Sequence, residues 1–155
     1  MRVHLGGDHA AYDLKGDLVA FLTDEGHEVI DHGPSHYDAQ DDYPVFVLRA
    51  AQGVRDDPGS LGIVLGGSGN GEQIAANKVA GIRAALCATP ELAELARAHN
   101  DAQVLSLGGR FIEPRQAREV VRAFLATPFS AQARHQRRLD MLSRYESDRT
   151  LPDLR

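Results

Sequence analysis

Five short apolar runs alternate along the chain with segments of helical periodicity, and this alternation restricts the possible folds more than any other feature of the sequence. The runs occupy residues 1–7, 27–33, 60–67, 81–88 and 102–109. The run at 60–67, SLGIVLGG, is apolar almost throughout and bounded by glycines, as is typical of a strand buried on both faces of a parallel sheet. Parallel neighbours need crossover connections, so the pattern predicts a three-layer α/β/α sandwich with a five-stranded, Rossmann-like parallel sheet.

The predicted helices fill the intervals between these strands and continue beyond the last one. Their apolar positions follow helical spacing over residues 10–26, 43–57, about 72–79, 90–100, 113–127 and 130–146. The final helix forms a C-terminal helix extension, and the last segment, DRTLPDLR, has the composition of a loose chain end. We therefore expect one domain over residues 1–147 and a tail over 148–155.

Composition excludes several classes of protein. A chain of 155 residues with 43% hydrophobic residues can bury one core, and its net charge of −5 gives no electrostatic footprint for nucleic acid or an anionic membrane. The single cysteine, Cys87, excludes an internal disulfide framework and a cysteine zinc cluster. The sequence has neither an apolar run long enough to span a membrane nor a secretory leader. We expect a cytoplasmic protein that binds neither nucleic acid nor membranes.

Gly-Gly pairs end three of the five predicted strands, in the segments GGDHA (6–10), GGSGNGE (66–72) and GGR (108–110). In open parallel sheets the ligand site lies beyond the carboxyl ends of the strands. Tight strand-to-helix turns also favour glycine, and this explanation is equally good for any one pair. Three pairs at one sheet edge favour a ligand that approaches the backbone closely.

The loop at 66–72 is the most informative of these segments. Bare backbone N–H groups at Ser68, Gly69, Asn70 and Gly71, just before a helix, form a concavity for an anion or a developing oxyanion. A Walker loop would end in Gly-Lys-Ser/Thr, and a dinucleotide fingerprint would follow the first strand, so nucleotide binding is not predicted.

Glu72 follows this loop at the expected start of the helix and has two interpretations. A carboxylate in the first turn of a helix stabilises it by ~0.3–1 kcal/mol and needs no further role. Alternatively, a Glu beside a group of N–H donors can remove a proton from a carbon whose neighbouring carbonyl oxygen those donors stabilise. An aldose-ketose isomerase, which forms an enediolate, requires this pairing.

Five motifs, in their order and spacing, resemble the B-type ribose-5-phosphate isomerase family, which also includes galactose-6-phosphate isomerase subunits. The motifs are GGDHA, DYP, LGGSGNGEQIAANKVAGIRAAL, ARAHNDAQVLSLGGR and RHQRRLD, and the likeness runs from residue 2 to about 147. It implies an enzyme of the pentose phosphate pathway that interconverts D-ribose 5-phosphate and D-ribulose 5-phosphate without a metal or cofactor. It also implies homodimers, or dimers of dimers, with active sites across the subunit interface.

One departure from the family pattern bears on the catalytic base. Many members have Cys immediately before the G-[ST]-G-x-G stretch, where this chain has Gly66. Cys87 lies within a predicted strand, where an inert buried thiol is expected. The sequence resembles instead a subgroup with Glu at the position of Glu72, and we interpret Glu72 as the base.

The resemblance gives roles to further residues, each of which also has a structural explanation. Asp8 matches a residue that holds sugar hydroxyls, and His9 one that approaches the phosphate; an N-cap and a polar loop residue are the alternatives. His99 matches the residue assigned to proton transfer during ring opening, and Asn100 accompanies it in the substrate site. His99-Asn100 could equally end a helix, and both roles can hold at once.

Phosphate requires positive charge. Arg134 and Arg138 stand on one face of a helix and match phosphate ligands, as does Arg110 after the last strand. A solvated basic helix is the alternative interpretation. Gly67 joins residues 68–71 in the substrate loop, whereas Arg137 and His135 are expected at the surface or an interface.

Two alternatives stay open at the level of sequence. The enzyme could prefer a six-carbon phosphosugar or a free aldohexose of the allose/psicose type, or the chain could be a non-catalytic sugar-phosphate sensor. A receiver domain would need a phosphoacceptor Asp at the end of the third strand, where Gly66 and Gly67 stand, and is not predicted. The sequence leaves open which subunit would contribute His99, Asn100 and Arg110.

Overall fold

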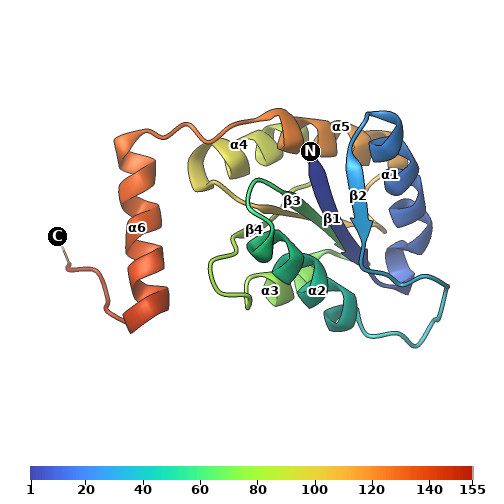
Figure 1. Cartoon of the computed structure of the whole chain (residues 1–155), viewed down its shortest axis with the longest axis horizontal. Helices are drawn as coiled ribbons and strands as arrows, with labels where there is room; N and C mark the ends of the chain where they lie inside the picture. The colour runs from blue at the N-terminus through green and yellow to red at the C-terminus, as the bar shows by residue number, and fades with distance from the viewer. Residues whose placement is uncertain (155) are drawn as a thin grey trace.

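The computed structural model describes residues 1–154 and contains a single parallel sheet of five strands in the order β2-β1-β3-β5-β4 (Figure 1). The strands are β1 (Arg2–Gly7), β2 (Glu28–Asp31), β3 (Leu61–Gly66), β4 (Ala84–Leu86) and β5 (Val104–Gly108). The order reverses between β1 and β3, and this reversal marks the place where ligands bind in open α/β sheets. The predicted parallel sheet is confirmed.

Residues 1–154 contain six α-helices, which connect and follow the strands, and one 3-10 turn before the first helix. They are η1 (His9–Ala11), α1 (Tyr12–Asp24), α2 (Tyr43–Asp56), α3 (Asn70–Ala76), α4 (Pro90–Asn100), α5 (Pro114–Ala126) and α6 (Ala133–Asp148). Proline stands in the first turn of α2, α4 and α5, where its missing N–H costs nothing. None of the helices in residues 1–154 has the length and apolar character needed to cross a membrane.

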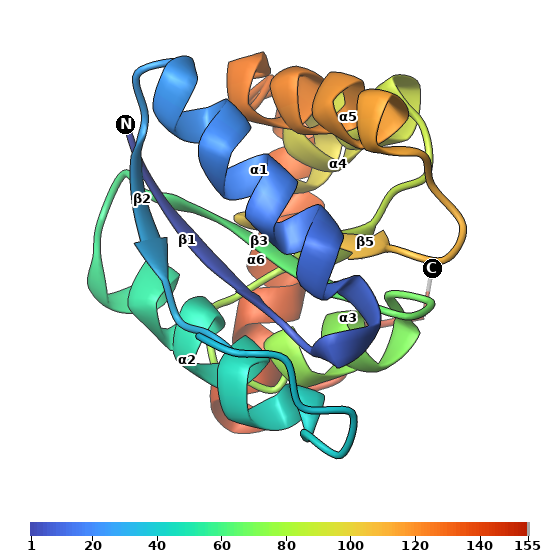
Figure 2. The ribbon, with the colours of Figure 1, turned by 90° about the vertical axis from the view of Figure 1, so that its right-hand side faces the viewer.

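The helices cover both faces of the sheet, as the predicted three-layer sandwich requires (Figure 2). The helices α1, α4 and α5 pack on one face around Leu5, Ile63 and Phe124, and α2 and α3 pack on the other around Val47 and Val64. All six residues of β3 are buried, in agreement with the apolar run at 60–67. Burial on both faces fixes β3, and with it the start of the glycine loop.

The edge strand β4 is shorter than predicted, and α3 ends at Ala76 rather than near residue 79. Asn77, the residue after α3, binds the first residue of β4. Its side-chain oxygen accepts the N–H of Ala84 at 2.9 Å, and its side-chain nitrogen donates to the Ala84 carbonyl at 2.9 Å. At Ala84 this asparagine side chain makes the hydrogen bonds that a further strand would make, and so covers part of the exposed edge of the sheet.

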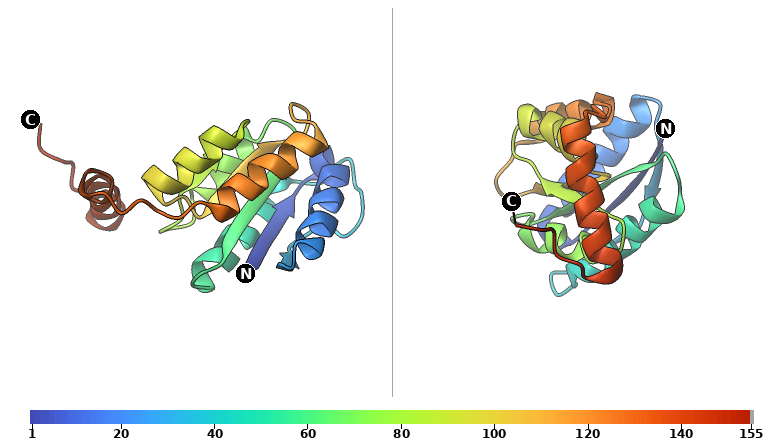
Figure 3. Two further views of the ribbon diagram at one scale, coloured as in Figure 1. Left: turned by 90° about the horizontal axis from the view of Figure 1, so that it is seen from above. Right: turned by 90° about the vertical axis from the view of Figure 1, so that its left-hand side faces the viewer.

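Helix α6 stands apart from the other helices, at the end of the molecule beyond α4 (Figures 1 and 3). The His135 ring packs on that of His99 with centroids 4.2 Å apart, and the Gly81 N–H donates to the Glu146 carboxylate at 2.8 Å. Leu142 and Tyr145 on the same helix are exposed. Arg134 and Arg138 are exposed as well, so α6 presents both apolar and basic side chains at its surface.

Candidate active site

The carboxyl ends of β1, β3 and β5 meet at one edge of the sheet and are joined by backbone hydrogen bonds. Asp8 N–H donates to the Leu65 carbonyl at 3.2 Å, and Gly109 N–H donates to the Gly66 carbonyl at 2.8 Å. Arg110 N–H reaches the Gly67 carbonyl at 3.1 Å. Three segments far apart in sequence thereby form one rigid rim. The residues placed there are Asp8, His9, Gly67, Ser68, Gly69, Asn70, Gly71, Glu72 and Arg110.

Two glycines of this rim are required by packing. Gly69 has a φ of +81°, and a Cβ there would lie 2.5 Å from a Leu86 methyl group. A Cβ on Gly108 would lie 2.5 Å from the Ser68 carbonyl oxygen. The buried Ser106 hydroxyl also donates to the Gly69 carbonyl at 2.7 Å, a contact that no sequence pattern indicated. The tight turn therefore accounts for glycine at these two positions.

Gly67 is different, because a Cβ there would have room. Its nearest neighbours would be the Ala10 methyl and the Arg110 guanidinium, both at 3.5 Å. Gly67 thus lies between η1 and Arg110, and it has no side chain to fill the space between them. Tyr43 covers the loop from the other side, since a Cβ on Gly71 would lie 2.8 Å from the Tyr43 ring.

The Glu72 carboxyl group folds back from the first turn of α3 onto the end of β3. Glu72 is 4% exposed, and a Cβ on Gly66 would lie 1.9 Å from Glu72 Oε1. The carboxyl group therefore occupies the space that a side chain at position 66 would need. A carboxylate that only complemented the helix dipole would remain in water, so burial distinguishes Glu72 from that simpler role.

Burial raises the pKa of Glu72 above its ordinary value of 4.5. Backbone N–H groups of Glu72 and Gly69, which hydrogen-bond the carboxylate, oppose this rise, and the nearby charge of Asp8 adds to it. The pKa of the Cys87 thiol is raised to about 11 by burial. Cys87 is therefore protonated at neutral pH and inert, as expected from the sequence.

Asp8 caps the turn η1, because its Oδ1 accepts the Ala10 N–H at 3.0 Å. The expected capping role is confirmed, yet Asp8 also lies close enough to Glu72 to affect its pKa. His9 follows and donates from Nδ1 to Asp41 Oδ1 at 2.6 Å. Atoms of Asp8, His9 and Asp41 that could bind a metal ion lie within 4.8 Å of one another, but His9 and Asp41 are already hydrogen-bonded to each other.

The remaining predicted residues lie elsewhere in the chain. His99 and Asn100 end α4, shortly before the start of β5, whereas Ser68 contacts the carboxyl end of β5, so the two groups lie toward opposite edges of the sheet. Arg134 and Arg138 lie exposed on α6. His135 is 2% exposed, because it packs beneath His99 and bonds Ser130 Oγ at 2.9 Å, so the expectation that it lies at the surface is wrong. A single chain thus divides the predicted site residues between two places.

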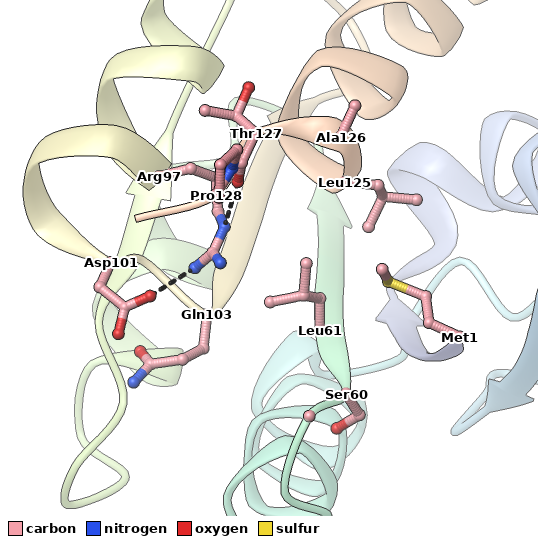
Figure 4. Close-up of a pocket in the computed structure, with 11 residues that line it drawn as sticks. Met1, Ser60, Leu61, Arg97, Asp101, Gln103, Leu125, Ala126, Thr127 and Pro128 are labelled. Carbon is pink, nitrogen blue, oxygen red and sulfur yellow. Dashed lines mark hydrogen bonds and ion pairs between the residues drawn. The ribbon is translucent and has the colours of Figure 1, made fainter. Parts of the chain in front are cut away.

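Hollows flank the rim of the sheet. One of about 290 Å³ lies beside Ser68 and Asn70 and is bounded by the exposed Phe111, and one of about 330 Å³ lies beside His9 and Tyr37. A larger cavity, of about 460 Å³, lies at the opposite edge (Figure 4). Its half-buried cation, Arg97, donates hydrogen bonds to Asp101 at 2.9 Å and to the Thr127 carbonyl at 3.3 Å. That cavity is therefore remote from Glu72, and its guanidinium is already neutralised.

Known proteins resemble this chain over nearly its whole length. The family model described as Ribose/Galactose Isomerase matches residues 3–142. Ribose-5-phosphate isomerase B of Mycobacterium tuberculosis is 55% identical over 98% of this chain and 94% of its own length, and the Escherichia coli protein of that name is 38% identical over 96% and 98%. A crystal structure of ribose-5-phosphate isomerase B from Mycoplasma genitalium with bound ribulose-5-phosphate has a TM-score of 0.90, at 38% identity, and covers 95% of this chain and 97% of that one.

Proposed function

The chain belongs to the ribose/galactose isomerase family, and on that premise we propose that it interconverts D-ribose 5-phosphate and D-ribulose 5-phosphate with Glu72 as the base. Relatives named ribose-5-phosphate isomerase B and a solved relative with bound ribulose-5-phosphate support the activity. The buried carboxylate of Glu72 against Gly66, beside the glycine loop, supports the choice of base. We assign the enzyme to the cytoplasm and the pentose phosphate pathway.

The proposed reaction moves one proton between two carbons. Glu72 removes the C2 proton of the open-chain aldose, the electrons form the C1–C2 double bond of the enediolate, and the proton returns to C1 while the O2 proton passes to O1. Negative charge develops on oxygen. In the glycine loop before α3 the N–H groups of Gly69 and Glu72 hold the Glu72 carboxylate and that of Asn70 holds Ser68 Oγ, so those of Ser68 and Gly71 are the donors that we assign to the developing oxyanion. The raised pKa of Glu72 makes it a stronger base than an exposed carboxylate.

A second subunit completes the proposed site. His99, Asn100, Arg134 and Arg138 lie far from Glu72 within one chain, on an end of the molecule that also exposes Leu92 and Leu95 of α4. In a homodimer, or a dimer of dimers, these polar residues would reach the rim of the partner. His99 would then transfer the proton for ring opening, and Arg134 and Arg138 would join His9 and Arg110 around the phosphate, with Asp8 on the sugar hydroxyls.

An activity assay tests the proposed function directly. Purified protein with chelator present should isomerise ribose 5-phosphate in preference to allose 6-phosphate and unphosphorylated sugars. Preference for a six-carbon substrate would establish the alternative specificity. Binding of sugar phosphates without turnover would point to a sensor, and loss of activity with chelator would contradict the metal-free mechanism.

Substituting Gly66 with alanine tests whether the Glu72 carboxyl group must stay where it lies. The new Cβ would overlap Oε1, which would be 1.9 Å away, so the carboxyl group must swing aside. We expect kcat to fall by about 100-fold, since displacement of a catalytic group by about 1 Å can have that effect. Gly16→Ala, where nothing lies within 4 Å of the added methyl group, is the control and should retain full activity. Normal turnover by Gly66→Ala would contradict the assignment of Glu72 as the base.

A further inference from the structure

We propose that Asp41 is a positioning residue, which holds the imidazole of His9 so that its Nε2 faces the phosphate group of the substrate. This inference rests on the proposed function. Asp41 belongs to the connection between β2 and α2, and no sequence motif singled it out. Its carboxylate makes its hydrogen bonds to one residue, His9.

Two bonds from the same oxygen fix His9. Asp41 Oδ1 accepts the backbone N–H of His9 at 3.1 Å and the ring Nδ1–H at 2.6 Å. A carboxylate carries no proton of its own, so Nδ1 must be the protonated nitrogen of a neutral His9 ring. Nε2 then remains for a ligand, and among residues 1–154 it has no hydrogen-bond partner. The edge of the Tyr37 ring, 6.3 Å away between centroids, limits rotation of the imidazole.

The burial of Asp41 indicates that its charge matters. The side chain is 8% exposed, and Oδ2 is buried with no hydrogen-bond partner in the described chain. An unpaired buried carboxylate oxygen is costly, and a loop anchor alone would be served equally well by asparagine. A protonated His9 beside it would offset this cost and could donate from both nitrogens, one to Asp41 and the other to an anion.

The position of His9 points to phosphate as that anion. His9 begins η1, and a Cβ on Gly67 would touch both η1 at Ala10 and the Arg110 guanidinium at 3.5 Å. Ala10, which follows His9 in the chain, and Arg110 therefore stand on two sides of the bare backbone at Gly67. An arginine and a histidine that can carry a second proton, beside bare backbone, form a surface suited to a phosphate group, whereas sugar hydroxyls need no such charge.

Asp41→Asn tests the inference, because it removes the charge and keeps the shape. We expect KM for ribose 5-phosphate and the inhibition constant of inorganic phosphate each to rise about 10-fold, with kcat within about twofold, since a hydrogen bond to a charged group is being weakened. Asp42→Asn is the matched control, because Asp42 is exposed and its side chain caps nothing. Unchanged KM and phosphate inhibition in Asp41→Asn would overturn the proposal.

A double-mutant cycle separates positioning from a general effect on the fold. In a His9→Gln background, Asp41→Asn should change phosphate inhibition by less than about twofold, because the residue through which Asp41 acts is gone. A full additional loss in that background would mean that Asp41 acts on the loop instead, and would overturn the proposal.

The unmodified enzyme provides a measurement that does not depend on a variant folding. Nitrogen-15 NMR of the histidine rings, with His9 assigned by comparison with His9→Gln, should show His9 with a proton on Nδ1. A neutral ring protonated on Nε2 would overturn the proposal. Wild-type protein that binds inorganic phosphate but lacks isomerase activity would refute the proposed function. The NMR measurement would still test whether Asp41 fixes the His9 ring.

Discussion

Replacing Glu72 with glutamine lowers kcat for ribose 5-phosphate by about a thousandfold, as loss of a general base does, and changes KM little. Glutamine keeps the size of the side chain and its place against Gly66, but it cannot accept the C2 proton. Exchange of the C2 proton with solvent should fall by the same factor. Initial rates and loss of tritium from C2-labelled substrate measure the two effects independently.

Two matched variants test whether this loss is specific to Glu72. Glu91→Gln removes an exposed carboxylate from the first turn of α4, so it measures the helix-dipole contribution without touching the site. Cys87→Ala removes the single thiol. Both variants should keep wild-type kcat. Near-normal turnover by Glu72→Gln, or inactivity of Cys87→Ala in a folded enzyme, would contradict the assignment of the base.

Glu72→Gln, which should lower kcat, should increase the stability of the folded protein at neutral pH. The pKa of Glu72 is raised in the folded state, so the unfolded chain releases this proton more readily, and ionisation favours unfolding. The resulting destabilisation sets in as pH rises above 4.5 and is complete once pH exceeds the folded pKa. At neutral pH we therefore expect Glu72→Gln to melt at a higher temperature than the wild type. The difference should vanish in acid, and kcat/KM of the wild type should fall as pH drops through the same raised pKa.

The pairing of Gly66 with Glu72 shows how the sequence could point to a candidate base. Each residue alone permits a trivial role, since glycine suits a turn and glutamate suits the start of a helix. In the structure the two residues depend on each other. A side chain at position 66 would overlap the Glu72 carboxyl group, so glycine leaves the space that this carboxyl group fills. The choice between a thiol at one position and a carboxylate at the other is therefore a choice of which side chain fills the same space.

The fold could be predicted because its determinants are local and repeated. Short apolar runs, four of them ended by glycine, indicated the five strands, and β3 is buried throughout as its composition required. The contacts that the sequence did not reveal join residues far apart along the chain and have no periodicity. Asn77 binds the edge of β4 at Ala84, Asp41 reaches back 32 residues to His9, and His135 is buried because α6 places it against His99.

Mixed dimers should recover activity that neither parent variant has, if subunits share the site. One parent carries Glu72→Gln, and the other carries Arg134→Ala with Arg138→Ala, which should raise KM for ribose 5-phosphate by about 100-fold through lost charge-assisted contacts. In a mixed dimer, one site has both defects and the other has neither. Dimers purified through two different affinity tags should therefore show about half of wild-type turnover at low substrate, as two-fold symmetry requires.

The outcome depends on which chain supplies the arginines, and that dependence makes the experiment decisive. If Arg134 and Arg138 served the Glu72 of their own chain, each site in the mixed dimer would keep one defect, and no activity would return. Arg144→Ala, which removes another exposed cation from α6, should leave KM unchanged and so controls for general loss of charge. Within one chain the end of α4 and the glycine loop lie toward opposite edges of the sheet, and α6 lies beyond α4, which favours recovery of activity. Recovery would also explain why α6 stands away from its own sheet: the helix carries residues whose function lies in the neighbouring subunit.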